Sequence, residues 1–123
     1  MSYRYSEAAK LAGEKWVGPH ECVALVQYYA KAPTTLHWKE GTRVRGENSL
    51  AAGTAIATFA KGKYGNRQTG NHAALYLSQD NNGIWVIEQY RHIKDGLIAK
   101  RYIPFRDGAG GASNDGDAYS VIE

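Results

Sequence analysis

The sequence predicts an α+β domain in which N-terminal helices pack on an antiparallel sheet of about four to six strands. Two observations carry this prediction. Helical spacing of apolar residues is confined to the start of the chain, and period-two alternation replaces it after residue 53. The 14 glycines and 9 tyrosines among 123 residues are also typical of a strand-rich chain with frequent turns. We expect a single domain covering residues 1–123.

Two helices are expected before the sheet. The first covers residues 6–12, where Ser6 can cap the helix and Gly13 can end it. The second covers residues 21–31, because apolar residues recur there at helical spacing. Pro33 blocks its extension. The polar segment 34–52 is expected to be a long loop with room for one short helix or strand.

The strands are expected to follow as a meander, because each apolar run ends in residues that favour turns. Their ranges are 54–59, 72–77, 84–90, 97–105 and 119–122. The segment between the second and third strands, Gln-Asp-Asn-Asn-Gly, is rich in residues that tolerate positive φ. It predicts a hairpin, and its loop length decides which side chains of the two strands share a face.

Charge and cysteine content exclude several classes of protein. The net charge of +3 is dispersed, and no basic run of the kind found in nucleic-acid-binding proteins occurs. A mildly positive protein would suit an anionic polymer such as a bacterial cell wall. The single cysteine excludes an internal disulfide and a multi-cysteine zinc site, and no histidine pair has metal-ligand spacing. We therefore expect no metal, no cofactor and no nucleic-acid partner.

The N-terminal segment has no apolar stretch of the signal-peptide type, and no apolar run is long enough to span a bilayer. We therefore expect synthesis in the cytoplasm, no membrane partner, and no export by the general secretory route.

Cys22 and His72 are the residues best placed for chemistry. Cys22 opens a predicted helix, where the backbone N–H groups and the helix dipole favour a thiolate. His72 opens a predicted strand, so we expect it at an edge rather than deep in the core. Cysteine-based nucleophilic catalysis needs both a thiol and a general base. The competing interpretation is a buried cysteine that only fills the core. His20 is a weaker candidate to line the same site.

A third polar residue would orient the imidazole, and two neighbours compete for that role. If the hairpin loop is the three residues 81–83, Glu88 shares a face with His72. If the loop is the two residues 82–83, Gln89 shares that face instead. A carboxylate stabilises an imidazolium better than an amide does, which favours Glu88. The local sequence leaves the choice open.

These residues resemble a known superfamily. The segment Glu-Cys-Val-Ala-Leu-Val-Gln at 21–27 is similar to the nucleophile helix of papain-like peptidoglycan amidases of the NlpC and CHAP types. The segments 70–76 and 84–90 resemble their histidine strand and the strand of their third polar residue. The chain from about residue 18 to 122, including Gly-Thr-Ala-Ile-Ala-Thr-Phe at 53–59, is similar to small bacterial amidase effectors of type VI secretion. Cys precedes His, which differs from the permuted relatives that act on lipids.

The resemblance implies a papain-like domain that hydrolyses an amide bond in the peptide stem or cross-link of peptidoglycan, with Cys22, His72 and Glu88 as its catalytic residues. It also implies an antibacterial toxin, exported by a specialised secretion system to the periplasm of a target cell, and an immunity protein as a partner. Many relatives carry an upstream tyrosine or glutamine beside the cysteine, for which Tyr3, Tyr5 and Trp16 are only candidates. Two other functions stay open: a catalytically silent binding or inhibitor domain, and a cysteine-dependent acyltransferase or deamidase.

Overall fold

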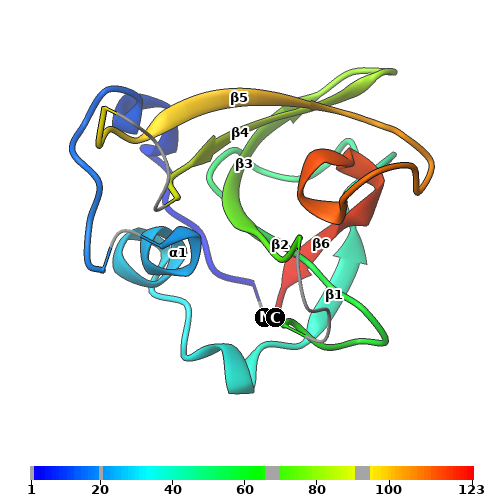
Figure 1. Cartoon of the computed structure of the whole chain (residues 1–123), viewed down its shortest axis with the longest axis horizontal. Helices are drawn as coiled ribbons and strands as arrows, with labels where there is room; N and C mark the ends of the chain where they lie inside the picture. The colour runs from blue at the N-terminus through cyan, green and yellow to red at the C-terminus, as the bar shows by residue number, and fades with distance from the viewer. Residues whose placement is uncertain (1, 20, 66–69, 91–94) are drawn as a thin grey trace.

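A six-stranded antiparallel sheet forms the centre of the structure, a computed structural model that describes residues 2–19, 21–65, 70–90 and 95–123. Within those residues one α-helix packs on the sheet (Figure 1). The predicted α+β class and the antiparallel sheet are therefore confirmed. The helical elements are η1 (Ala8–Leu11), α1 (Cys22–Ala30), η2 (Thr35–His37), η3 (Ala112–Asn114) and η4 (Gly116–Ala118). The strands are β1 (Glu40–Arg43), β2 (Ala55–Thr58), β3 (Ala73–Gln79), β4 (Gly83–Glu88), β5 (Ala99–Pro104) and β6 (Tyr119–Ile122).

The order of the strands across the sheet is β1-β6-β2-β3-β4-β5, so the expected simple meander is wrong. The C-terminal strand β6 inserts between β1 and β2 and pairs antiparallel with both. All four residues of β6 are buried, whereas β1 is largely exposed. A strand with apolar side chains on both faces gains most from a central position, and a polar strand such as β1 tolerates the edge.

The helix α1 matches the predicted second helix. Glu21 precedes it in an extended conformation, and Lys31 ends it in the left-handed region with φ 63°. The predicted first helix shrinks to one 3₁₀ turn, because bridges between Arg4 and Thr54 and between Lys15 and Leu97 fix the chain on both sides. None of the helices within the described ranges has the length and apolar character needed to cross a lipid bilayer.

The β3–β4 hairpin differs from both expected loops. Asp80 donates its N–H to the Gly83 carbonyl at 3.0 Å, so the two-residue loop is residues 81–82. That register alone would place Gln89, not Glu88, on the face of His72. A bulge at Leu77 then adds one residue to β3, which exchanges the faces on which Glu88 and Gln89 lie. Glu88 therefore lies on the same face of the sheet as His72.

Apolar side chains bury both faces of the sheet. On the α1 face, alternate residues of the strands, such as Leu75 and Ile87, pack against Leu25 and Val26 of the helix. On the opposite face, Tyr119 lies in a second cluster that segment 44–50 and the loop after β5 cover. The members of this second cluster are Val44, Ile56, Ala74, Tyr76, Ile84, Val86, Ile103, Tyr119 and Val121.

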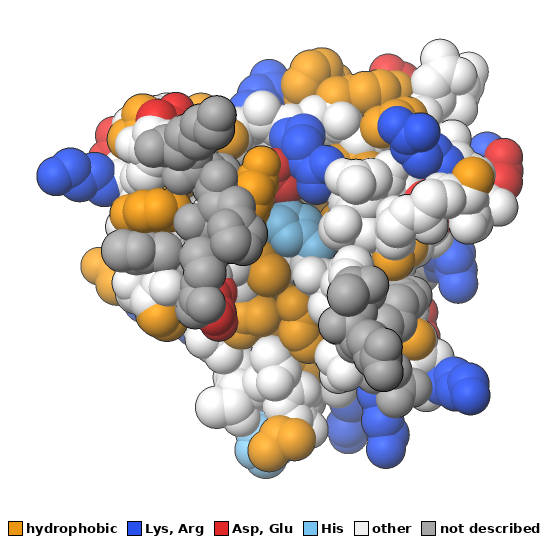
Figure 2. All heavy atoms as spheres, viewed as in Figure 1, with side chains coloured by type: hydrophobic (Ala, Val, Ile, Leu, Met, Phe, Trp, Pro, Cys, Tyr) orange, Lys and Arg blue, Asp and Glu red, His pale blue; other side chains and the backbone are white. Residues whose placement is uncertain are grey.

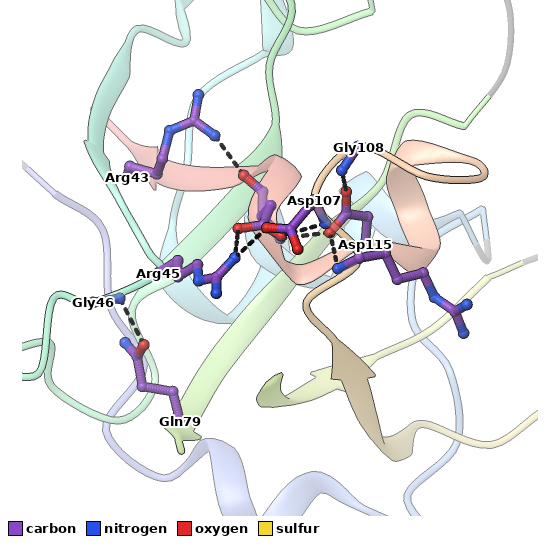
Figure 3. Close-up of polar contacts among 9 residues, drawn as sticks. Arg43, Arg45, Gly46, Gln79, Asp107, Gly108 and Asp115 are labelled. Atoms are coloured by element: carbon purple, nitrogen blue, oxygen red, sulfur yellow. Dashed lines mark hydrogen bonds and ion pairs between the residues drawn. The ribbon is translucent and has the colours of Figure 1, made fainter. Parts of the chain in front are cut away.

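Hydrogen bonds to aspartates hold the loop between β5 and β6 (Figure 3). The Asp115 carboxylate accepts from the backbone N–H groups of Arg106, Gly108 and Asp117. Arg45, from the segment after β1, donates to Asp117 at 2.6 Å and ties the loop to the rest of the sheet. This bracing fixes η3, which lies next to the candidate site.

Candidate active site

Cys22 is the first residue of α1, and its thiol is half-buried. His72 immediately precedes β3. It lies beside Cys22, because the thiol interacts with both the His72 side chain and the Ala73 backbone. The start of the helix and the start of β3 thus meet at one end of the sheet. The expectation that Cys22 and His72 come together holds in the structure.

The contacts between Cys22 and His72 favour a thiolate–imidazolium pair. Burial would raise the pKa of the Cys22 thiol, but hydrogen bonding to His72 and the charge of its imidazole lower the pKa overall. Burial would lower the pKa of His72, but its hydrogen bonds to Cys22 and Glu88 raise it to about 9. The two directions agree, since each charged partner stabilises the other.

Glu88 accepts a hydrogen bond from Nε2 of His72 at 2.7 Å. This bond leaves Nδ1 of the ring for the Cys22 thiol. His72 is 5% exposed and Glu88 only 1%, so the expected edge position of the histidine is wrong. The rings of Tyr90 and Tyr119 lie edge-on to the imidazole, with centroids 6.3 and 6.5 Å away, and enclose it. Burial strengthens the interaction between the imidazole and the carboxylate.

The second oxygen of Glu88 lies 2.8 Å from Nε of Arg101. The N–H of Arg101 is not aligned with that oxygen, so the contact is an ion pair rather than a directed hydrogen bond. Burial would raise the pKa of Glu88, but His72 and Arg101 together lower it. Sequence reasoning missed Arg101. The available signal was its position in β5, on the same face as buried Ile103, where a cation needs an anionic partner.

Gln89, the rival of Glu88, has another role. Its amide donates to the carbonyl oxygens of Val17 and Glu21 at 2.9 and 3.0 Å. Its carbonyl oxygen accepts from the Val17 N–H at 2.9 Å. Gln89 therefore lies on the α1 face and holds the segment that leads into Cys22.

Tyr64 is the hydroxyl-bearing side chain beside the thiol, with its Oη 3.6 Å from Sγ. Burial and the neighbouring Cys22 raise the pKa of Tyr64, so it stays a donor at neutral pH. It comes from a turn after β2 and not from the upstream candidates. Tyr3 and Tyr5 pack against the core, and Trp16 lies against Gly96.

No local signal points to Tyr64, since an aromatic residue in a Lys-Gly-Lys-Tyr-Gly turn predicts no specific role. His20, the weaker candidate, lies outside the described residues. Among the residues that the structure describes, no three His, Cys, Asp or Glu side chains gather in a way that could hold a metal ion.

Two hollows border the Cys22–His72 pair, one beside each residue, and both are lined by Tyr90. The larger, of about 610 Å³, adjoins the thiol and is lined by Tyr64, Tyr90 and residues of α1 and segment 34–35. The smaller, of about 320 Å³, adjoins the imidazole and is lined by Arg101, Tyr90 and residues of η3. Figure 2 shows this face hollowed, with a histidine side chain at its floor. A substrate that passes through both hollows would cross the thiol and the imidazole.

The chain resembles known proteins over its full length. A family model described as "Domesticated amidase effector 2" matches residues 2–122. A "Type VI secretion amidase effector 2 protein" of Salmonella typhi is 38% identical, and the match covers 100% of both chains. A "Domesticated amidase effector 2" of Ixodes scapularis is 35% identical over 87% of this chain and 73% of the relative.

A solved structure of a "Type 6 secretion amidase effector 2 (Tae2)" superposes with a TM-score of 0.88 and 37% identity, over 98% of this chain and 94% of that one. The expected papain-like α+β fold is thereby confirmed, and so is the expected likeness to amidase effectors of type VI secretion. The chain belongs to the domesticated amidase effector 2 family.

Proposed function

We propose that this protein is a cysteine amidase that hydrolyses an amide bond in the peptide stem or cross-link of bacterial peptidoglycan. The observation that carries the proposal is the chain of contacts from Cys22 through His72 to buried Glu88, which borders two hollows. The names of its relatives support an amidase, and the small net positive charge suits an anionic wall polymer.

The geometry supports acylation of Cys22. The thiolate attacks the scissile carbonyl carbon, an S–C bond forms, and the carbonyl electron pair moves onto oxygen. The N-terminus of α1 and the Tyr64 hydroxyl are placed to stabilise that oxyanion. The oxyanion then collapses and breaks the C–N bond, while the His72 imidazolium gives its proton to the leaving amine.

Deacylation uses the same residues in reverse. Neutral His72 takes a proton from water, the hydroxide attacks the thioester carbonyl, and the C–S bond breaks to release a carboxylic acid and the Cys22 thiolate. Glu88 keeps the imidazole in the tautomer with hydrogen on Nε2, which leaves Nδ1 to exchange protons with thiol, amine and water.

Digestion of purified peptidoglycan, followed by mass analysis of the soluble fragments, tests the proposal. We expect new fragments that carry a free amine and a free carboxyl, and their masses would also identify the bond that is cut. Cys22→Ala should lower turnover by at least about a thousandfold and keep the fold. Intact peptidoglycan in the presence of a wild-type protein whose thiol reacts rapidly with iodoacetamide would contradict a wall substrate and favour acyl transfer or deamidation.

We further propose that the protein acts in the periplasm of a target cell after delivery by a specialised secretion system, and that an immunity protein protects the producer. The names of the relatives support type VI secretion. Expression in a bacterial cytoplasm should be harmless, whereas periplasmic targeting should cause lysis that Cys22→Ala abolishes. Equal toxicity in both compartments would contradict this.

A further inference from the structure

Arg101 links the buried carboxylate of Glu88 to η3, in the loop between β5 and β6. Its Nε lies 2.8 Å from one Glu88 oxygen, while the other Glu88 oxygen accepts from His72. The two remaining guanidinium nitrogens donate to η3, to Asn114 Oδ1 at 2.9 Å and to the Ser113 carbonyl at 3.1 Å. Each oxygen of Glu88 thus has its own partner, and Arg101 is itself held at its outer end.

The anchor for Arg101 is rigid. The Ser113 carbonyl also accepts from the hydroxyl of buried Tyr119 at 2.9 Å. The aspartate bonds drawn in Figure 3 hold the same loop on both sides of η3. A side chain tied to such an anchor loses little further entropy when it pairs with Glu88, which makes the pairing stronger.

Glu88 needs a second partner because it is almost fully buried. The ionisable groups around it are His72 from the start of β3, Arg101 from β5 and Tyr119 from β6. Of these, Arg101 alone carries a permanent positive charge. Without Arg101, one oxygen of the carboxylate would face the interior without a cation, and burial would favour its protonated form.

We propose that Arg101 is a positioning residue for the reaction: it keeps Glu88 ionised and oriented, and Glu88 in turn holds the imidazolium that stabilises the Cys22 thiolate. The inference rests on the proposed function for the identity of the reaction. The proposal adds Arg101 to Cys22, His72 and Glu88, and it assigns to η3 the role of holding Arg101 in place.

The first measurement is the rate of Cys22 alkylation by iodoacetamide against pH. In Arg101→Gln the pKa of Glu88 should rise, so Glu88 takes up a proton at a higher pH and the imidazolium loses its counter-ion. The acid limb of the alkylation profile should therefore move up by about one pH unit, which is roughly a tenfold loss of rate on that limb. At pH 8, where Glu88 stays ionised, the rate should remain within about twofold of wild type.

The second measurement asks whether Arg101 acts through Glu88. In a Glu88→Gln background the carboxylate is already absent, so adding Arg101→Gln should not lower the alkylation rate further. On peptidoglycan, Arg101→Gln should lower kcat and change KM by less than about twofold. A raised KM with an unchanged alkylation profile would overturn the proposal, because it would make Arg101 a substrate contact.

Arg106→Gln is the matched control, since Arg106 donates to the Asn114 carbonyl of the same turn and makes no contact with Glu88. It should behave as wild type.

If Arg101→Gln does not fold, Arg101→Lys replaces it. The lysine keeps the charge, but its single ammonium cannot reach both Glu88 and η3. The acid limb of Arg101→Lys should therefore lie between those of wild type and Glu88→Gln. An Arg101 variant whose profile coincides with that of wild type, or equal losses in both backgrounds, would overturn the proposal. Alkylation needs no peptidoglycan. Failure to cut peptidoglycan would therefore refute the proposed function, whereas the alkylation profiles would still test the role of Arg101.

Discussion

Glu88 and Gln89 are neighbours in sequence and point to opposite faces of the sheet. Glu88 faces His72 and forms a buried, charged contact with it. Gln89 faces α1 and forms three neutral hydrogen bonds with the backbone before Cys22. One residue contacts the proposed base His72, and the other holds the segment that leads into the proposed nucleophile Cys22. A strand end can therefore align both halves of a catalytic pair, because adjacent side chains alternate between faces.

This division depends on the bulge at Leu77. Without the bulge, the two-residue turn would place the amide against His72 and the carboxylate against the backbone carbonyls of Val17 and Glu21. A carboxylate cannot donate to a carbonyl, so that arrangement would leave buried acceptors without partners. The bulge thus places Glu88 and Gln89 each on the face where its side chain finds hydrogen-bond partners of the right kind.

Glu88→Gln should have the largest effect among changes that keep Cys22 and His72. A glutamine is uncharged and offers a single oxygen, so it cannot supply both the His72 hydrogen bond and the Arg101 ion pair. We expect kcat/KM on peptidoglycan to fall on the order of a hundredfold. Stability should change little by comparison, since the side chain keeps its volume.

The pH profile of Glu88→Gln gives a second readout. His72 must be protonated to give a proton to the leaving amine, so activity falls as pH rises through its pKa of about 9. Removal of the carboxylate lowers that pKa, and the alkaline limb should move below pH 9. Glu47→Gln is the control, since the carboxylate of half-buried Glu47 accepts from Ser49, and its profile should match that of the wild type. An alkaline limb that stays at pH 9 would show that Glu88 does not support the imidazolium.

Tyr64→Phe should have a smaller effect, because it removes one donor and leaves both faces of β4 intact. The hydroxyl is 3.6 Å from the thiol sulfur, a weak contact in the resting enzyme. If it also donates to the oxyanion, kcat should fall about tenfold with little change in KM. A loss of alkylation rate equal to the loss of kcat would instead limit Tyr64 to supporting the thiolate. Tyr28→Phe, on the exposed side of α1, is the matched control.

The sequence predicted the parts of this site that local patterns encode. The helix that starts at Cys22 and the last strand at 119–122 follow from local periodicity and turn residues. The residues that pairing between distant segments brings in were harder to find. Tyr64 reaches the thiol across 42 residues, and β6 inserts between β1 and β2 from the far end of the chain. Such contacts depend on register and burial, which no short window of sequence contains.

Charge alone favours Glu88 over Gln89 in the sequence, whatever the register of the hairpin. Both predicted loops are wrong, and Glu88 still faces His72. Chemistry restricts which side chain can face an imidazolium more strongly than local propensity restricts a turn. Arg101 illustrates the same rule, since a cation on the buried face of β5 requires an anion nearby.

Gln89→Leu should have the smallest effect on chemistry and a clear effect on stability. The leucine fills similar space but leaves the Val17 N–H and two carbonyls without their bonds. Buried groups that lose their partners cost about 1–3 kcal/mol, so the free energy of unfolding should fall by about 2–3 kcal/mol in urea, with an unchanged m-value. Gln27→Leu, which removes one bond to Pro33, should cost less.

The pH dependence of Gln89→Leu then tests the comparison of the two faces. Because Gln89 does not face His72, the acid limb of the alkylation profile and the alkaline limb of peptidoglycan hydrolysis should both stay where they are in the wild type. The plateau rate should fall less than about threefold, as the segment before Cys22 loosens without a change of charge. A shifted alkaline limb of hydrolysis with unchanged stability would place Gln89 on the imidazole and would reverse the roles assigned to Glu88 and Gln89. If Glu88 and Gln89 point to opposite faces, Gln89→Leu should lower the stability and leave the pH profiles unshifted.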